Sequence, residues 1–400
     1  MTRLSERIRS LASSPTFAIQ AKAKALEAAG RDILDLSAGE PDFLPPEGAL
    51  EAARTAITSG ANRYAPVAGV PALRQAVADL YNREHGLQIT AGQVLVSHGG
   101  KQALSNLTQC LLGPGDEAIV LVPGWVSYAP QIQLAGATVV PVVTESDEGF
   151  QPDPDVIAAA ITERTRLILL NSPNNPTGCV IDEARLRAID EIAERAGVVV
   201  VSDELYRAIT FGNAPAVCHG SLRDPTLSRT VIVDAISKTW AMTGWRVGFL
   251  LGPTDVIEAC ARLQGHTTSG VCRVNEAAAL QAITGSQDFL AGVLLDLEAR
   301  RDLMVQGLQR IDGVTLEVVP DGAFYVFPRV DALFGRRAPD GSVLHDAAGV
   351  AAALLDLTGV ATVPGGAFGE PRCIRLSYAT STQTVIEAMA RLAEAVARLR

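Results

Sequence analysis

The chain has 400 residues, more than one hydrophobic core usually holds, so we expect a large domain and a smaller one. A net charge of −10 disfavours a nucleic-acid or anionic-membrane partner. No run of ~20 apolar residues and no apolar stretch at the start is present, so we expect a cytoplasmic protein that begins with a helix. The dispersed cysteines and histidines predict free thiols and no metal site.

Short β-branched runs alternate with amphipathic stretches along the first two thirds of the chain. The expected strands cover residues 94–97, 118–122, 138–142, 167–171, 198–202, 230–234 and 247–251. Helices are expected at 101–112, 182–196 and 253–263. This alternation predicts an α/β fold with a mostly parallel, seven-stranded sheet that helices cover on both faces.

The pattern changes near residue 286. A long helix is expected to about residue 310, and then strands at 314–319 and 324–327, a surface loop at 336–342, a helix at 344–357, a strand at 373–377 and a helix at 381–399. We therefore predict three regions. An N-terminal helix and arm with a short strand at 33–36 (1–45) packs with a small C-terminal α+β domain (286–400), and a large domain (46–285) lies between them.

Polar residues follow the carboxyl ends of predicted strands, where ligands bind in open parallel sheets. Lys238, after Ser237, is expected to be poorly solvated, which lowers its pKa and suits imine formation, although most such lysines are surface charges. Asp203 ends another apolar strand, with Tyr206 three residues on. This carboxylate is suited to pair with a protonated ring nitrogen, and a helix cap is the alternative.

Three further segments have the same character. The turn from Asn171 to Gly178 contains two prolines, one option being a cis X-Pro bond, and holds Asn175 rigidly. Gly99 and Gly100 open a helix whose N–H groups suit an anion. Arg375 lies in an apolar strand and needs a partner, either a substrate carboxylate or a structural ion pair.

Together these segments resemble the fold-type I aminotransferases of class I/II, which depend on pyridoxal 5′-phosphate (PLP), and especially the bacterial aspartate and aspartate/prephenate aminotransferases. The resemblance spans nearly the whole chain. Its motifs include Ser37-Ala38-Gly39-Glu40-Pro41-Asp42, Arg63-Tyr64-Ala65-Pro66, Gly99-Gly100-Lys101-Gln102, Trp125-Val126-Ser127-Tyr128, Asn174-Asn175-Pro176-Thr177-Gly178, Ser202-Asp203-Glu204, Ser237-Lys238, Gly244-Trp245-Arg246 and Arg375-Leu376-Ser377-Tyr378.

The resemblance implies a role for each matching residue. Lys238 would carry PLP as a Schiff base and move the α-proton, Asp203 would face the ring nitrogen, and Tyr206 and Asn175 would bind the ring's phenolic oxygen. Trp125 would stack on the ring, and the phosphate would be surrounded by Gly99, Gly100, Lys101, Ser237 and Arg246. Tyr64 would reach the phosphate of a partner subunit, which implies a homodimer.

On the substrate side, Arg375 would bind the α-carboxylate, with Gly39, Asn175 and Trp125 nearby, and Lys101 would recognise a distal carboxylate. A second phosphate-side charge is the alternative for Lys101. The implied reaction moves an amino group from an L-amino acid, aspartate or another acidic one, to a 2-oxo acid such as 2-oxoglutarate.

Two residues depart from the branch. Gly124 precedes Trp125 where an aromatic residue is usual, and His266 stands where relatives mostly have Gln, in a segment expected near the partner's site. An altered substrate is therefore an option, as is another PLP reaction such as elimination, replacement or annulation. His266 is either a substrate-binding residue or a plain surface or interface residue. A non-catalytic descendant of the family is a third option, which the full residue set disfavours.

Overall fold

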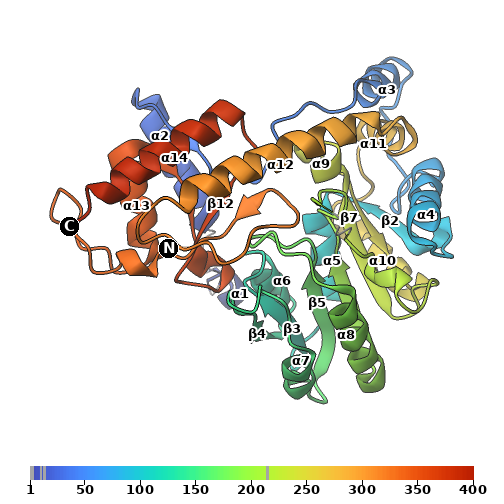
Figure 1. Cartoon of the computed structure of the whole chain (residues 1–400). Coiled ribbons are helices and arrows are strands. Elements are labelled where there is room, and N and C mark those ends of the chain that lie inside the picture. Colours follow the sequence, from blue (N-terminus) through green and yellow to red (C-terminus); the bar gives the residue numbers. More distant parts are fainter. Residues whose placement is uncertain (1–3, 10, 12–14, 213–215) are drawn as a thin grey trace.

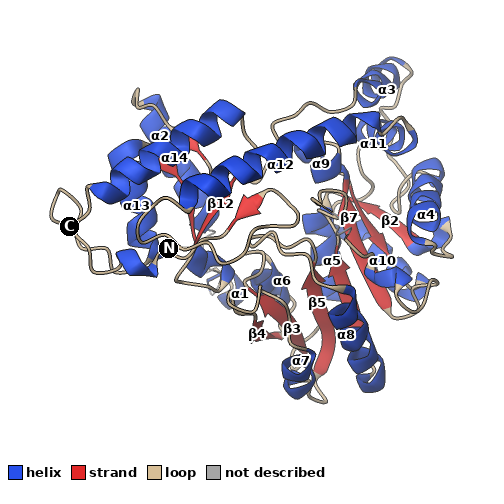
Figure 2. Cartoon of the chain, viewed as in Figure 1, coloured by secondary structure: helices blue, strands red, loops and turns tan. Residues whose placement is uncertain are grey.

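The computed structural model describes residues 4–9, 11, 15–212 and 216–400, and it shows a large sheet beside a smaller group of helices and short strands (Figures 1 and 2). The large sheet contains β2 (Val94–Ser97), β3 (Glu117–Val122), β4 (Thr138–Val143), β5 (Thr165–Asn171), β6 (Val199–Asp203), β7 (Thr230–Ala235) and β8 (Gly248–Leu251). Their order is β2-β8-β7-β6-β5-β3-β4, and only β8 runs antiparallel to its neighbours. The predicted α/β fold is confirmed.

Successive side chains of the strands point to opposite faces of this sheet, and helices cover both faces. Val231 and Val233 face the layer of α5 (Gly100–Leu111), α6 (Tyr128–Leu134) and α10 (Thr254–Thr267). Ile232 between them faces α4 (Pro71–His85) and α11 (Arg273–Thr284), on which α3 (Glu47–Thr58) packs. Farther along the same face, Ile168 packs with α7 (Pro154–Ala160) and α8 (Glu183–Ala196). Polar side chains of the strands are therefore confined to the first two and last two positions of each strand.

Helix α8 shows how the sequence sets these boundaries. The side chain of Asp182 caps its first turn by accepting from the N–H of Arg185, and Gly197 ends it in a left-handed conformation. Leu186, Ile189 and Ala193 lie on one stripe and are buried against the sheet. Caps at both ends and an apolar stripe at helical spacing explain why this helix matches its predicted range.

The smaller part contains α2 (Pro15–Ala28), α12 (Asp288–Leu308), α13 (Ala347–Thr358) and α14 (Thr382–Ala397), with β9 (Tyr325–Val326), β10 (Val360–Ala361), β11 (Val363–Pro364) and β12 (Ile374–Ser377). The N-terminal β1 (Leu34–Asp35) pairs in parallel with β10. In Figure 1, α12 runs from beside α11 to the C-terminal elements. The predicted division at residues 45 and 285 stays a prediction. No helix among the described residues is long and apolar enough to cross a membrane.

One predicted strand is wrong. Residues 314–319 alternate in exposure, as a strand would, but form only an isolated bridge between Thr315 and Arg329. A strand requires a continuous ladder of hydrogen bonds, and alternation of side chains alone does not supply one. The strand predicted at 324–327 is shortened to β9, while residues 336–342 form a mostly exposed loop.

Close contact between β8 and the start of α5 gives a stability prediction. A Cβ atom at Gly248 would lie 2.4 Å from the backbone nitrogen of Gly100 and from the carbonyl carbon of Gly99. Gly248→Ala should lower the unfolding free energy by about 1–3 kcal/mol, because backbone must move, and the melting temperature should fall by a few degrees. Gly244→Ala is the matched control, since nothing lies within 4 Å of the added carbon. Equal melting temperatures for the two variants, measured by calorimetry, would contradict this account.

Candidate active site

Five strands of the large sheet direct their carboxyl ends, or the loops that follow, to one edge, because they share the same direction. Gly99, Trp125, Asn175 and Lys238 follow β2, β3, β5 and β7 there, respectively, and Asp203 is the last residue of β6. The predicted candidates therefore come from separate strands of one sheet edge.

Lys238 lies in the short helix α9 (Ile236–Thr239), which directly follows β7. Its Nζ donates to the carbonyl oxygen of Gly39 at 2.5 Å. Burial lowers the pKa of Lys238 to about 8, with Arg375 and Arg246 acting in the same direction and Glu40 opposing them. A lysine of lowered pKa supplies more neutral amine near neutral pH, and this is the form that acts as a nucleophile and a base.

Asp203 is the buried last residue of β6. Its Oδ2 accepts from the hydroxyl of Tyr128 at 2.6 Å, and its backbone oxygen accepts from Nδ2 of Asn171 at 2.9 Å. Burial raises the pKa of Asp203 to about 6, and the Tyr128 hydrogen bond opposes this rise. None of the ion pairs among the described residues includes Asp203, so this carboxylate is available to a cationic ring nitrogen.

Arg375, on β12, is a buried cation held by neutral groups. Its Nη1 donates to Oδ1 of Asn175 at 3.0 Å, and its Nη2 donates to the backbone oxygen of Ser37 at 2.7 Å. Its Nε is buried without a hydrogen-bond partner, and no ion pair within the described ranges involves Arg375. A buried guanidinium without an anion is costly, so the geometry favours a carboxylate ligand over a structural ion pair.

The turn between Asn171 and Gly178 connects these groups. Asn171 accepts from the backbone N–H of Asn175 at 2.9 Å, and the Ser172–Pro173 bond is cis. Because the amide oxygen of Asn175 is engaged by Arg375, its NH₂ group is the part that can donate to a further oxygen. Asn175 thus connects Asn171, at the end of β5, to Arg375 on β12.

Positive charge gathers at the start of α5. A Cβ at Gly99, which has a φ of +81°, would lie 2.5 Å from Nη2 of Arg246, so glycine permits this approach. The amine of Lys101 lies 5.1 Å from the ring centroid of Trp125. Burial and Arg246 lower the pKa of Lys101. A helix N-terminus flanked by two cations is a favourable environment for a phosphate.

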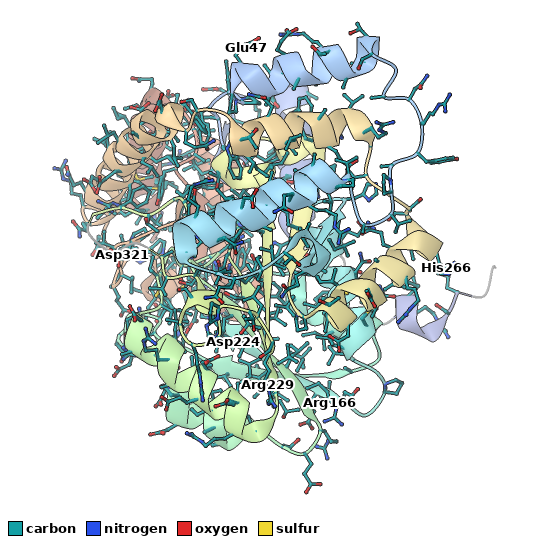
Figure 3. The ribbon with its side chains drawn as sticks, turned by 90° about the vertical axis from the view of Figure 1, so that its right-hand side faces the viewer. Glu47, Arg166, Asp224, Arg229, His266 and Asp321 are labelled. Atoms are coloured by element: carbon teal, nitrogen blue, oxygen red, sulfur yellow. The ribbon has the colours of Figure 1, made fainter. Side chains whose placement is uncertain are left out.

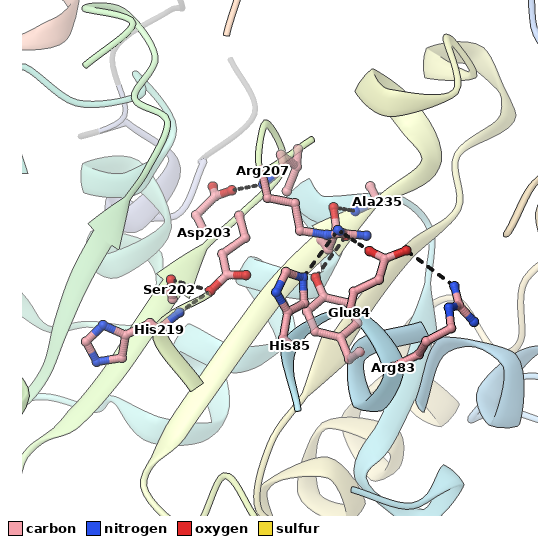
Figure 4. A network of polar contacts seen from close by, with 12 residues as sticks. Arg83, Glu84, His85, Ser202, Asp203, Arg207, His219 and Ala235 are labelled. Atoms are coloured by element: carbon pink, nitrogen blue, oxygen red, sulfur yellow. Dashed lines mark hydrogen bonds and ion pairs between the residues drawn. The ribbon is translucent and has the colours of Figure 1, made fainter. Parts of the chain in front are cut away.

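A buried polar network fixes the loop after β6 (Figure 4). Arg207 pairs with Asp234 of β7 and with Glu84 of α4, both at 3.0 Å. The Tyr81 hydroxyl donates to the same Asp234 oxygen at 2.9 Å. Breaking such a buried pair costs about 3–5 kcal/mol, so the loop that carries Tyr206 is held firmly. The Tyr206 hydroxyl lies 2.9 Å from that of Tyr325 on β9.

A comparison with known proteins agrees with this arrangement. A sequence model of the family aminotransferase class I and II matches residues 31–392. The chain belongs to this family. It is 40% identical over 393 residues to an aspartate/prephenate aminotransferase of Cereibacter sphaeroides, which covers 98% of each chain. It is also 40% identical over 399 residues to an aspartate aminotransferase of Geobacillus stearothermophilus, covering 98% of this chain and 99% of that one.

Solved structures of aspartate aminotransferases have the same fold. That of the Thermus thermophilus enzyme with maleate has a TM-score of 0.92 at 40% identity and covers 99% of this chain and 100% of its own. That of the Rhizobium meliloti enzyme has a TM-score of 0.96 at 37% identity and covers both chains fully. This chain is therefore a PLP-dependent aminotransferase, as the sequence predicts.

The residues of this aminotransferase fit PLP. Lys238 provides the amine, Asp203 a carboxylate without a cation of its own, and the start of α5 with Arg246 an anion site. When bound, PLP withdraws electrons from the substrate's α-carbon, and the chain supplies binding, orientation and proton transfer. The specific role of each residue remains a prediction.

Several predicted residues lie elsewhere or have a different character. Tyr64 is 96% exposed in the loop before α4, and His266 is exposed in the last turn of α10 (Figure 3). No contact among the described residues joins either to Lys238 or Arg375, so both roles stay predictions about a partner subunit. Ser237 is buried beside Lys238. A Cβ at Gly124 would lie 2.4 Å from the carbonyl oxygen of Leu121, so any larger residue would require the backbone there to move.

Three residues at the site are not among the sequence candidates. Tyr128 lies in the quoted motif that begins at Trp125, and Asn171 begins the predicted turn at the end of a strand, so their positions could have drawn attention to them. Tyr325 lies in the apolar segment 324–327, whose pattern indicates only core. Its contacts with the site depend on which strands pair.

The Asp203–Tyr128 contact predicts a pH dependence of PLP uptake by the apoenzyme. The ring nitrogen needs an ionised Asp203, so affinity should fall as pH drops through about 6, where this acid gains its proton. Tyr128→Phe removes a hydrogen bond that lowers this pKa, so the fall should begin at higher pH. Absorbance titration with PLP between pH 5 and 8 tests this. Identical profiles for wild type and Tyr128→Phe would contradict it, and Tyr378→Phe, another buried tyrosine, serves as control.

Proposed function

We propose that this aminotransferase takes the amino group of L-aspartate, or of another acidic amino acid, and passes it to a 2-oxo acid such as 2-oxoglutarate. With aspartate the first product is the corresponding four-carbon 2-oxo acid, and the amino group then converts 2-oxoglutarate to glutamate. The relatives named above as aspartate or aspartate/prephenate aminotransferases support this donor. They do not favour elimination, replacement or annulation.

The observation that carries the proposal is the buried Arg375. Its guanidinium has neutral acceptors on Nη1 and Nη2 and a buried Nε without a partner. A planar α-carboxylate would supply the missing negative charge, and a guanidinium can hold it by two parallel hydrogen bonds. Every amino acid carries this group, so Arg375 supports the substrate class without selecting the side chain.

Lys101 supports the acidic side chain. It lies in the first turn of α5, with its amine 5.1 Å from the Trp125 ring. Trp125 would stack on the cofactor ring, so the Lys101 amine beside it would face a substrate bound to that cofactor. A distal carboxylate would gain a charge-assisted hydrogen bond there, which a neutral side chain cannot form.

The reaction assigns proton transfer to Lys238. Once its nitrogen is free, it takes the α-proton of the amino acid and returns a proton to the cofactor side, so the lysine ends each half-reaction as it began. Its lowered pKa suits both steps. Asp203 would hold the ring nitrogen protonated, while Tyr206 and the Asn175 amide donate to the phenolic oxygen.

The homodimer and the cytoplasmic location belong to the same proposal. The exposed Tyr64 would contribute to a partner's phosphate site, and His266 would lie near the partner's substrate. All six cysteines lie within the described residues and are free, in keeping with a reducing compartment.

Single-turnover spectroscopy tests the donor. Aspartate should convert the yellow holoenzyme to its colourless amine form, and 2-oxoglutarate should restore the colour. The Lys238→Ala variant should not show this cycle. If aspartate and glutamate both leave the spectrum unchanged while another amino acid shifts it, the acidic-donor proposal is wrong. Release of ammonia without the amine form would indicate elimination instead.

Lys101 makes a separate prediction about specificity. Lys101→Met should lower kcat/KM for aspartate by about 10–100-fold, the loss of one charge-assisted hydrogen bond, and leave alanine within about threefold. Lys24→Met, at an exposed lysine of α2, is the matched control. An equal loss with both donors, together with weaker PLP binding, would assign Lys101 to the phosphate.

A further inference from the structure

Tyr325 lies where two strands of the small sheet bring it onto Arg375. β9 pairs antiparallel with β12, with Tyr325 opposite Ser377. Arg375 stands two residues before Ser377, so its side chain leaves the same face of the sheet. The guanidinium carbon lies 4.5 Å from the centroid of the Tyr325 ring. The aromatic face of Tyr325 therefore lies against the guanidinium of Arg375.

The hydroxyl of the same side chain points to a different part of the site. It lies 2.9 Å from the hydroxyl of Tyr206, and both tyrosines are buried. A Cβ at Gly39 would lie only 3.0 Å from it, so glycine leaves room for the hydroxyl. The carbonyl of that glycine accepts from Lys238. One side chain therefore contacts the carboxylate-binding cation and the Tyr206 hydroxyl.

We propose that Tyr325 is a positioning residue that couples Arg375 to Tyr206, with its ring and its hydroxyl performing separate tasks. The ring holds the guanidinium in place for the substrate carboxylate, and the hydroxyl orients that of Tyr206 and makes it a stronger donor. The inference rests on the proposed function, in which Arg375 binds the α-carboxylate and Tyr206 donates to the cofactor's phenolic oxygen.

The ring's task follows from cation–π attraction. Arg375 lies over Tyr325 at 4.5 Å and over Phe368 at 5.1 Å, both within the range of this interaction. Because the Arg375 Nε is buried without a hydrogen-bond partner, the rings replace part of its missing polar surroundings. Loss of one ring should let the guanidinium move and weaken carboxylate binding.

The hydroxyl's task follows from the direction of the hydrogen bonds. Burial raises the pKa of both phenols, so each carries its proton at neutral pH. If Tyr206 gives its proton to the cofactor oxygen, its own oxygen accepts from Tyr325. Donation to a phenol oxygen makes that phenol a stronger acid, and the cofactor's phenolic oxygen is then better stabilised in its anionic form.

Other charged and titratable groups face Tyr206 or Lys238 and contribute to any pH midpoint of this site. They are Asp203 of β6, Tyr128 of α6, Lys238 of α9, Arg375 of β12, Arg246 after η3 (Thr243–Trp245), and Glu40 of the N-terminal segment. The variants below retain all of them, so a shift reports the loss of one hydroxyl or one ring.

Two variants of the holoenzyme separate the two tasks. Tyr325→Phe keeps the ring and removes the hydroxyl. The pH midpoint of the visible absorption of PLP on Lys238 should rise by about 0.5–1 unit, while KM for the donor stays within about twofold. Tyr325→Leu removes both groups and should raise KM as well, by about 3–30-fold. Tyr378→Phe is the control, because its hydroxyl bonds the Ala323 backbone at 3.3 Å, and neither quantity should change.

The absorption titration needs no substrate and so stays valid whichever donor the enzyme uses. KM is measured with aspartate or, if wild type rejects aspartate, with the amino acid that converts it, so a wrong donor is recognised in wild type alone. An unmoved midpoint in Tyr325→Phe overturns the hydroxyl's role. An unmoved KM in Tyr325→Leu that binds PLP overturns the ring's role. If Tyr325→Leu fails to fold, Tyr325→Met removes the same ring with a longer apolar side chain, and an unmoved KM in that variant overturns the ring's role.

Discussion

A sheet buried on both faces leaves few places for charge, and this constraint organises the molecule. Side chains along β5, β6 and β7 alternate between two apolar helix layers, so polar groups are tolerated only where the strands end. Asp203 ends β6, and Asn175 and Lys238 follow the ends of β5 and β7 on the same edge. The candidate active site thus lies at the edge of the large sheet to which the carboxyl ends of these buried strands point.

The electrostatics of the site are unbalanced without its ligands. Burial lowers the pKa of Lys238, and the nearby Arg375 and Arg246 act in the same direction, while Asp203 is a buried acid with a hydroxyl partner. A cofactor with a phosphate and a basic ring nitrogen, followed by a substrate carboxylate, supplies the complementary charges. The arrangement is preorganised for those groups, because the network around Arg207 and Asp234 fixes the neighbouring loop.

The sequence predicts what depends on local pattern. The seven strands of the large sheet and the caps of α8 follow from β-branched runs, Asp182 and Gly197. Lys238, Asp203 and Arg375 are recognisable because a charged side chain beside an apolar strand is costly to bury without a partner. Tyr325 could not be found this way, since its neighbours are apolar and its contact with Arg375 depends on the pairing of β9 with β12. Residues 314–319 show the opposite case, alternation without a partner strand.

The contact between Ser37 and Arg375 has a consequence for synthesis on the ribosome. The two residues are 338 positions apart, yet the backbone oxygen of the first holds the guanidinium of the second. At about 5–20 residues per second, roughly 20–70 s separate their translation. The N-terminal segment is therefore without this native partner until almost the whole chain has been synthesised, and the contact between Ser37 and Arg375 is among the last that a nascent chain can complete.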